Sequence, residues 1–179
     1  MTFLYPLYFF VSGCVNNPKD IPFSDKKLTS VEEGKQIEGY YSADAKVKSK
    51  LTAPYMLRHI TDATYIEFPK SLHVDFYNDT MKIESVLDAH YGKYREFEQK
   101  VFLRDSVVVR NILKGDTLHC DELWWDRNTQ KFYTDKKVRI NTKDKVLYGV
   151  GLEAAQNFSW YVIKQGAGTL MTPESGLPN

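Results

Sequence analysis

The sequence predicts an all-β fold in which antiparallel hairpins stack into a sandwich or an incompletely closed jellyroll. A phrase of the form Leu-x-small residue occurs four times, starting at Leu51, Leu87, Leu118 and Leu152. An alternating apolar run follows each of the first three copies after about 20 residues, which is typical of repeated hairpins. Helical periodicity is nearly absent from the sequence, so only another sheet can cover the apolar face of such hairpins.

The first predicted strand, residues 45–53, alternates cleanly between small or apolar side chains and polar ones. Successive residues of a strand point to opposite faces, so three lysines and a threonine share the wet face. The lysines are interpreted as a solvated strand face rather than a phosphate-binding patch. The opposite, inward face carries Ala45, Val47, Ser49, Leu51 and Ala53.

The second copy, residues 81–89, repeats this alternation, with Val86 as an apolar exception on its wet face. The returning strands alternate in the same way, and clusters of turn residues separate them at 77–79, 114–116, 127–129 and 141–144. The inward residues of the second copy are Met81, Ile83, Ser85, Leu87 and Ala89, and those of the returning strands are Leu72, Val74, Phe76, Val107, Val109, Val138 and Ile140.

The composition agrees with one such domain and excludes a general surface for nucleic acids. The chain has 179 residues, which is long enough to bury a sizeable core. Its 24 basic side chains nearly balance 23 acidic ones, so there is no net positive field to attract a phosphate backbone.

The amino terminus carries an independent signal for membrane attachment. Residues 3–11 are almost wholly apolar and lead to Val11-Ser12-Gly13-Cys14 and then to a polar segment. The apolar run is too short to span the roughly 30 Å of bilayer hydrocarbon as a helix, but it has the length of a signal-peptide core. Small residues before Cys14 suit cleavage and diacylation of its thiol, as in bacterial lipoproteins. No Lys or Arg precedes the run, so either the true start lies upstream or the segment is a degenerate signal. Another kind of membrane anchor and a buried strand are the alternatives to the lipoprotein interpretation.

Four segments follow from this pattern. Residues 1–14 are expected to be a lipoprotein-type signal or membrane anchor, and residues 15–36 a polar tether. Residues 37–171 are expected to form the β-domain, and residues 172–179 a flexible tail rich in Pro and Gly.

Candidate catalytic and metal-binding groups are scattered, so the sequence predicts neither an enzyme nor a metal site or cofactor. The four histidines form no H-x-x-x-H pair, and Cys120 replaces alanine on a packed face. Carboxylate pairs such as Glu84 with Asp88 lie on wet faces, where charge is the ordinary case. Pairs of aromatic residues, Trp124 with Trp125 and Phe158 with Trp160, are interpreted as seals at the ends of the core.

Five stretches of the sequence resemble the LptC family, the periplasmic component of lipopolysaccharide export, over about residues 28 to 170. The related bridge protein LptA shares the hairpin repeat, and the membrane-attachment signal favours the LptC branch. The anchor departs from better-known members, which carry a longer transmembrane helix. The five stretches are 41–54, 66–77, 121–126, 132–138 and 149–154.

The resemblance implies a twisted, partly open antiparallel β-jellyroll at the periplasmic face of the inner membrane. Its apolar groove would receive acyl chains of lipopolysaccharide from the LptF/LptG/LptB transporter and pass them to an LptA-like bridge protein. Small residues among the inward side chains would leave room for a guest. The implied groove residues are Val47, Leu51, Leu72, Val74, Ile83, Leu87, Val107, Val109, Leu118, Val138 and Ile140.

The open ends of such a jellyroll would leave strand edges for partner chains. The segment from Ser42 to Lys48 would lie toward the transporter. The last strand would offer its edge to the bridge protein at Val162, Gly166 and Gly168, where the glycines would allow close approach. The rival interpretation is an envelope lipoprotein whose filled β-sandwich serves as a structural or interaction module.

Overall fold

The computed structural model describes residues 30–43 and 45–170, and every regular element in this part of the chain is a β-strand. All pairings between these strands are antiparallel, as expected for successive hairpins. The eleven strands described are β1 (Ser30–Ala43), β2 (Lys46–Ile60), β3 (Tyr65–Phe68), β4 (Leu72–Tyr77), β5 (Ile83–Ala89), β6 (Tyr91–Arg95), β7 (Lys100–Asn111), β8 (Thr117–Asp126), β9 (Lys131–Asn141), β10 (Lys145–Ala155) and β11 (Tyr161–Leu170).

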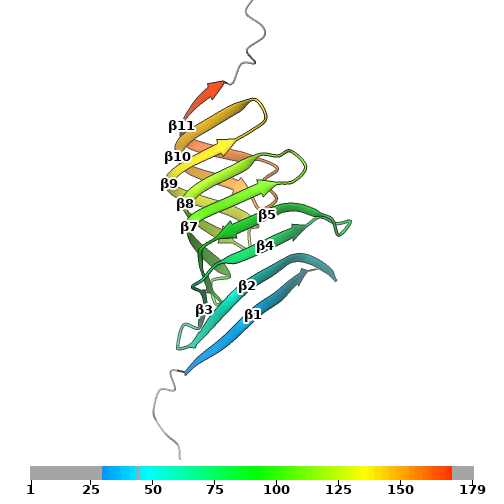
Figure 1. Ribbon diagram of the computed structural model, residues 1–179, viewed down its shortest axis with the longest axis vertical. Coiled ribbons are helices and arrows are strands. Elements are labelled where there is room, and N and C mark those ends of the chain that lie inside the picture. The colour runs from blue at the N-terminus through cyan, green and yellow to red at the C-terminus, as the bar shows by residue number, and fades with distance from the viewer. Residues whose placement is uncertain (1–29, 44, 171–179) are drawn as a thin grey trace, which may run out of the picture.

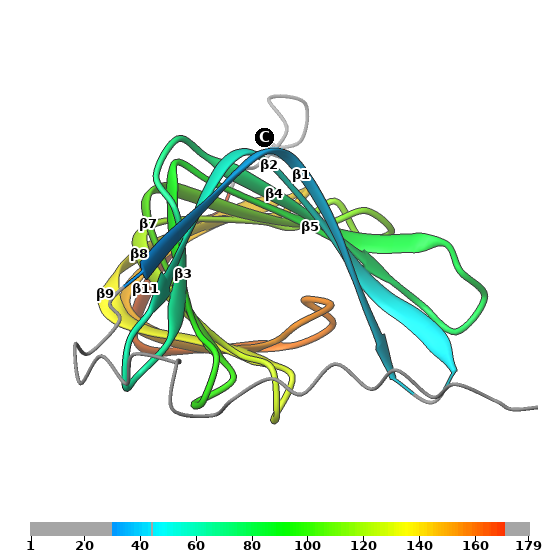
Figure 2. The ribbon, with the colours of Figure 1, turned by 90° about the horizontal axis from the view of Figure 1, so that it is seen from below.

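One continuous sheet folds over on itself to form two layers (Figure 1, Figure 2). The short strands β4 and β5 belong to the first layer, and β3 and β6 belong to the second. Longer strands take part in both. In β7, residues 108–111 pair with β5 while residues 100–104 pair with β6. The predicted all-β, partly open jellyroll built from hairpins is therefore confirmed.

Irregularities in the long strands produce the fold between the layers. The β7–β8 register shifts between Arg104 and Val107, where Asp105 and Ser106 adopt positive φ values of 65° and 59°. Related shifts occur within β8 and β10, the latter at Gly151, whose φ is 78°. Such bulges bend a strand and increase its twist. These register shifts lie at neighbouring positions of adjacent strands, so the corners line up and form a crease along the molecule.

The predicted alternation of faces holds along the strands and changes phase at these corners. In β4, Leu72, Val74 and Phe76 are buried while the residues between them are partly exposed. In β8, Leu118 is buried before the corner and Leu123 after it, an odd spacing that only a bulge permits. The core lies between the two layers.

Three sequence-based details differ from the structure. Residues 30–36, expected in the tether, belong to β1, an edge strand whose side chains are mostly exposed. Ala45 and Met81, expected on inward strand faces, lie outside the strands with φ values of 59° and 61°. Trp160 does not seal the core, because 42% of it is exposed.

Strands β1 and β11 form the two edges of the described sheet and lie at opposite ends of its long axis (Figure 1). β1 pairs with β2, and β11 pairs with β10. The expected signal or anchor with Cys14, most of the expected tether and the expected tail lie outside the described residues.

Candidate functional site

The inner face of the folded sheet brings together most of the residues predicted to line the groove. Eight of the eleven are buried: Leu72, Val74, Leu87, Val107, Val109, Leu118, Val138 and Ile140. Val47 and Leu51 lie half-buried on β2, and Leu51 faces the interior because it pairs with Val74. Ile83 is the exception, since it begins β5 and is 40% exposed. The inner face is therefore a largely apolar surface from β2 to β9, with a few buried polar side chains, among them Ser85 and Asn111.

This surface is more open near β1 and β2 than at the centre of the molecule. On the β1–β2 hairpin the apolar side chains that pack against the core, Ile37, Leu51 and Met56, are only partly buried. The β1–β2 hairpin thus extends the apolar surface beyond the filled part of the core.

Farther along, large aromatic side chains fill the interior. Phe76, Trp125 and Phe132 meet across the two layers with ring centroids 5.0 to 6.3 Å apart. Edge-on and tilted arrangements of this kind add to the stabilisation from burial alone. Phe76 and Phe132 are fully buried, so this cluster closes the centre of the jellyroll.

The small residues on the inner face are buried, but the space beside one of them is occupied. The Ser85 hydroxyl donates a hydrogen bond of 3.1 Å to the Gln156 carbonyl oxygen, in the connection between β10 and β11. This connection reaches inward between the layers (Figure 2). Cys120 packs as a small apolar residue, and burial raises the pKa of its thiol to about 12.

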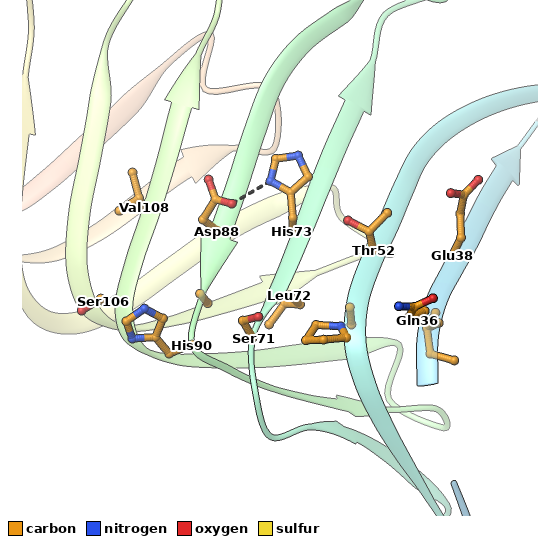
Figure 3. Close-up of a pocket in the computed structure, with 14 residues that line it drawn as sticks. Gln36, Glu38, Thr52, Ser71, Leu72, His73, Asp88, His90, Ser106 and Val108 are labelled. Atoms are coloured by element: carbon orange, nitrogen blue, oxygen red, sulfur yellow. Dashed lines mark hydrogen bonds and ion pairs between the residues drawn. The ribbon is translucent and has the colours of Figure 1, made fainter. Parts of the chain in front are cut away.

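The outer side of the crease holds a separate hollow of about 730 Å³ (Figure 3). Its lining includes His73 and Asp88, whose Nδ1 and Oδ1 atoms are 2.6 Å apart, and His73 Nε2 is 3.0 Å from Asp75 Oδ1. Burial lowers the pKa of His73, but the hydrogen bonds to Asp88 and Asp75 outweigh it and raise that pKa above 6.5. Glu38 and Thr52 also line this hollow, together with apolar residues such as Leu72 and Val108, so its lining is mixed.

Within the described residues, no group of His, Cys, Asp and Glu side chains could hold a metal ion. The same part of the chain contains no helix with the length and apolarity needed to cross a membrane.

The residues predicted for partner docking lie on β11, at one edge of the sheet. Val162 is 58% exposed, and Gly166 and Gly168 occupy the same strand. Gly166 also has an internal role, because it pairs with Gly149 of β10. A Cβ atom at Gly149 would lie 2.4 Å from the Gln165 carbonyl oxygen, so the two strands approach closely there.

Sequence reasoning missed the β10–β11 connection as part of the site. The aromatic pair Phe158 and Trp160 was expected to seal an end of the core, and Phe158 is buried as expected, but the polar contacts of the connection were not foreseen. The polar partners of this connection, Ser85 and Asn111, lie 71 and 46 residues away from the residues they contact. No local pattern connects such distant positions.

Comparison with known proteins shows the family to which this chain belongs. A search of curated proteins found no match. The family model described as "Lipopolysaccharide-assembly, LptC-related" matches residues 18–159, which is more than half of the chain and includes most of the folded sheet. The hairpin repeat, the folded jellyroll and this match agree, and the chain belongs to the LptC-related family of lipopolysaccharide-assembly proteins.

Proposed function

We propose that this protein transports lipopolysaccharide by holding its acyl chains against the inner face of the jellyroll. The observation that carries the proposal is the largely apolar surface from β2 to β9 within a fold of this family. Acyl chains need apolar lining and few directional bonds, and each buried CH₂ group contributes about 0.8 kcal/mol. Transfer along this surface requires no chemistry from the chain itself.

The half-buried surface on β2 supports entry of the lipid at the β1–β2 end. Leu51 and Val47 can contact a guest there without displacing the aromatic cluster around Phe76. We place the LptF/LptG/LptB transporter at this end, with its ATP hydrolysis supplying the energy for loading. The chain would be attached to the periplasmic face of the inner membrane by its amino terminus, through lipidation of Cys14 or another hydrophobic anchor.

The free edge of β11 supports handover to an LptA-like bridge protein. An edge strand can be extended by a partner through main-chain hydrogen bonds. Val162 is exposed on this edge, and β11 lies at the end of the molecule opposite β1 (Figure 1). The direction of transport would then run from β1 to β11.

A second candidate function is a structural or interaction module of the cell envelope. The filled interior favours it, because Leu87, Leu118 and Ile140 have no exposed surface in this structure. A sandwich that is already filled resembles a folded core more than an empty lipid carrier.

The two candidates differ in how they respond to a charge on the inner face. Leu51→Arg should abolish binding of purified lipopolysaccharide, because the guanidinium would lie where acyl chains pack. Thr52→Arg, next to it on the opposite face, is the matched control and should bind normally. Val109→Arg tests the deeper surface in the same way, with melting to check its fold. Equal binding by both β2 variants would contradict lipid transport along the inner face.

A further inference from the structure

We propose that residues 156–160, here named the plug, are an internal ligand that occupies the lipid site and must leave before acyl chains reach the β7–β9 part of the inner face. This inference rests on the proposed function and deepens it. The plug connects β10 to β11 and extends from the second layer toward the first, across the mouth between them (Figure 2).

One aromatic side chain anchors the plug in the apolar interior. Phe158 has no exposed surface and stacks on Tyr161 with ring centroids 5.0 Å apart. Its backbone has a φ of 56°, a left-handed conformation that is unfavourable for a residue with a side chain. The connection thus adopts a strained turn that directs a large apolar group inward, as an acyl chain would be directed.

Three polar side chains of the sheet hold the plug, and each of them donates to an oxygen atom. Ser85 Oγ donates to the Gln156 carbonyl oxygen over 3.1 Å, and Trp125 Nε1 donates to Gln156 Oε1 over 2.8 Å. Asn111 Nδ2 donates to the Asn157 carbonyl oxygen over 2.8 Å. Ser85, Asn111 and Trp125 are all buried, so these donors would lose their acceptors if the plug left and nothing replaced it.

This arrangement defines the class of ligand that can replace the plug. A replacement must supply an apolar chain for the space of Phe158 and acceptor oxygens for the three donors. An acylated lipid with ester, amide or hydroxyl oxygens near its chains has both parts. A plain hydrocarbon would leave the buried donors unpaired, and a soluble sugar would leave the apolar space unfilled.

An exposed contact offers a way to lock the plug. Lys114 Nζ, in the turn between β7 and β8, donates to the Ser159 carbonyl oxygen over 2.5 Å, and both residues are exposed. The variant Lys114→Cys with Ser159→Cys can therefore be joined by a bismaleimide with a cleavable disulfide linker. A matched control joins Lys136→Cys to Glu122→Cys, whose native side chains form an ion pair of 3.7 Å across the paired strands β8 and β9, away from the plug.

The experiment uses the full chain with Cys14→Ser, and a small diazirine amino acid replaces either Leu51 or Leu118. Purified lipopolysaccharide is the probe. Locking the plug should reduce photo-capture at Leu118 at least tenfold, leave capture at Leu51 unchanged, and be reversed by cleaving the linker. The Lys136–Glu122 crosslink should change capture at neither site.

Unchanged capture at Leu118 after locking would overturn the proposal that the plug blocks the β7–β9 part of the inner face. Equal loss at Leu51 and Leu118 would also overturn it, since the barrier would then lie at the entrance. Absence of capture at both sites before any crosslinking would refute the proposed function itself. The proposed role of the plug, which rests on that function, would then be refuted as well. Phe158→Ala provides a second measurement, because weakening the anchor should raise capture at Leu118, whereas Trp160→Ala should not.

Discussion

Phe158 offers a quantitative test of how the β10–β11 connection packs. Its side chain has no exposed surface, and removing such a side chain from a core costs about 3 to 5 kcal/mol. The connection lies outside the strands and can partly close the cavity, so we expect Phe158→Ala to lower the free energy of unfolding by about 3 kcal/mol.

The backbone at Phe158 predicts an unusual order for two substitutions. With a φ of 56°, a residue bearing a Cβ atom costs about 1 to 2 kcal/mol more than glycine. Glycine loses about 0.4 to 1 kcal/mol more through the entropy of the unfolded chain. The difference leaves Phe158→Gly more stable than Phe158→Ala by up to about 1.6 kcal/mol and by about 0.8 kcal/mol at the middle of both ranges, the reverse of the order expected within a strand.

Urea unfolding followed by far-ultraviolet circular dichroism measures both effects, with an unchanged denaturant slope as the check on two-state behaviour. Trp160→Ala is the matched control, because Trp160 is 42% exposed and its loss should cost less than about 1 kcal/mol. A loss below about 1 kcal/mol for Phe158→Ala, or an alanine variant more stable than the glycine variant, would refute this description of the connection.

Three further predictions concern other parts of the molecule. Burial opposes protonation of His73, but the hydrogen bond to Asp88 favours it, so Asp88→Asn should lower the pKa of His73 in an NMR titration. In the parent, the contribution of this pair to the free energy of unfolding is fully present below the ordinary pKa of 6.5 and is lost as the pH rises through the raised pKa. The same pH dependence of the free energy of unfolding in Asp88→Asn would contradict this. Burial raises the pKa of the Cys120 thiol to about 12, so a thiol reagent should modify it only after unfolding, and rapid modification of the native protein would show that it is accessible. Val162→Pro, like truncation after Ser159, should weaken binding to an LptA-like protein while Val162→Thr does not, and undiminished binding by folded Val162→Pro and truncated variants would exclude docking through β11.

The sequence predicted the strand faces well, because period-2 alternation depends on neighbouring residues. Leu72 and Val74, or Val138 and Ile140, are buried as their spacing predicts. The corners were not predictable in the same way. Asp105 and Ser106 adopt positive φ values because the strand must turn between two layers, and this requirement comes from distant pairings.

The limits of β1 and the role of the β10–β11 connection depend on tertiary context for similar reasons. Residues 30–35 of β1 pair with β2 without apolar alternation, because an edge strand can be held by main-chain hydrogen bonds alone. From the sequence, Ser85 is interpreted as a small inward residue that leaves room for a bound acyl chain. In the structure its hydroxyl binds the Gln156 carbonyl oxygen, which fills that room with the chain itself.

Photo-capture from two adjacent valines tests the central claim most directly. Val109 is fully buried on the inner face of β7, whereas Val108 faces the hollow on the outer side of the crease. A small diazirine amino acid at each position changes the same residue type on the same strand, and purified lipopolysaccharide is again the probe. We expect capture from Val109 and little or none from Val108. Equal capture from both positions, or capture from Val108 alone, would contradict lipid transport along the inner face.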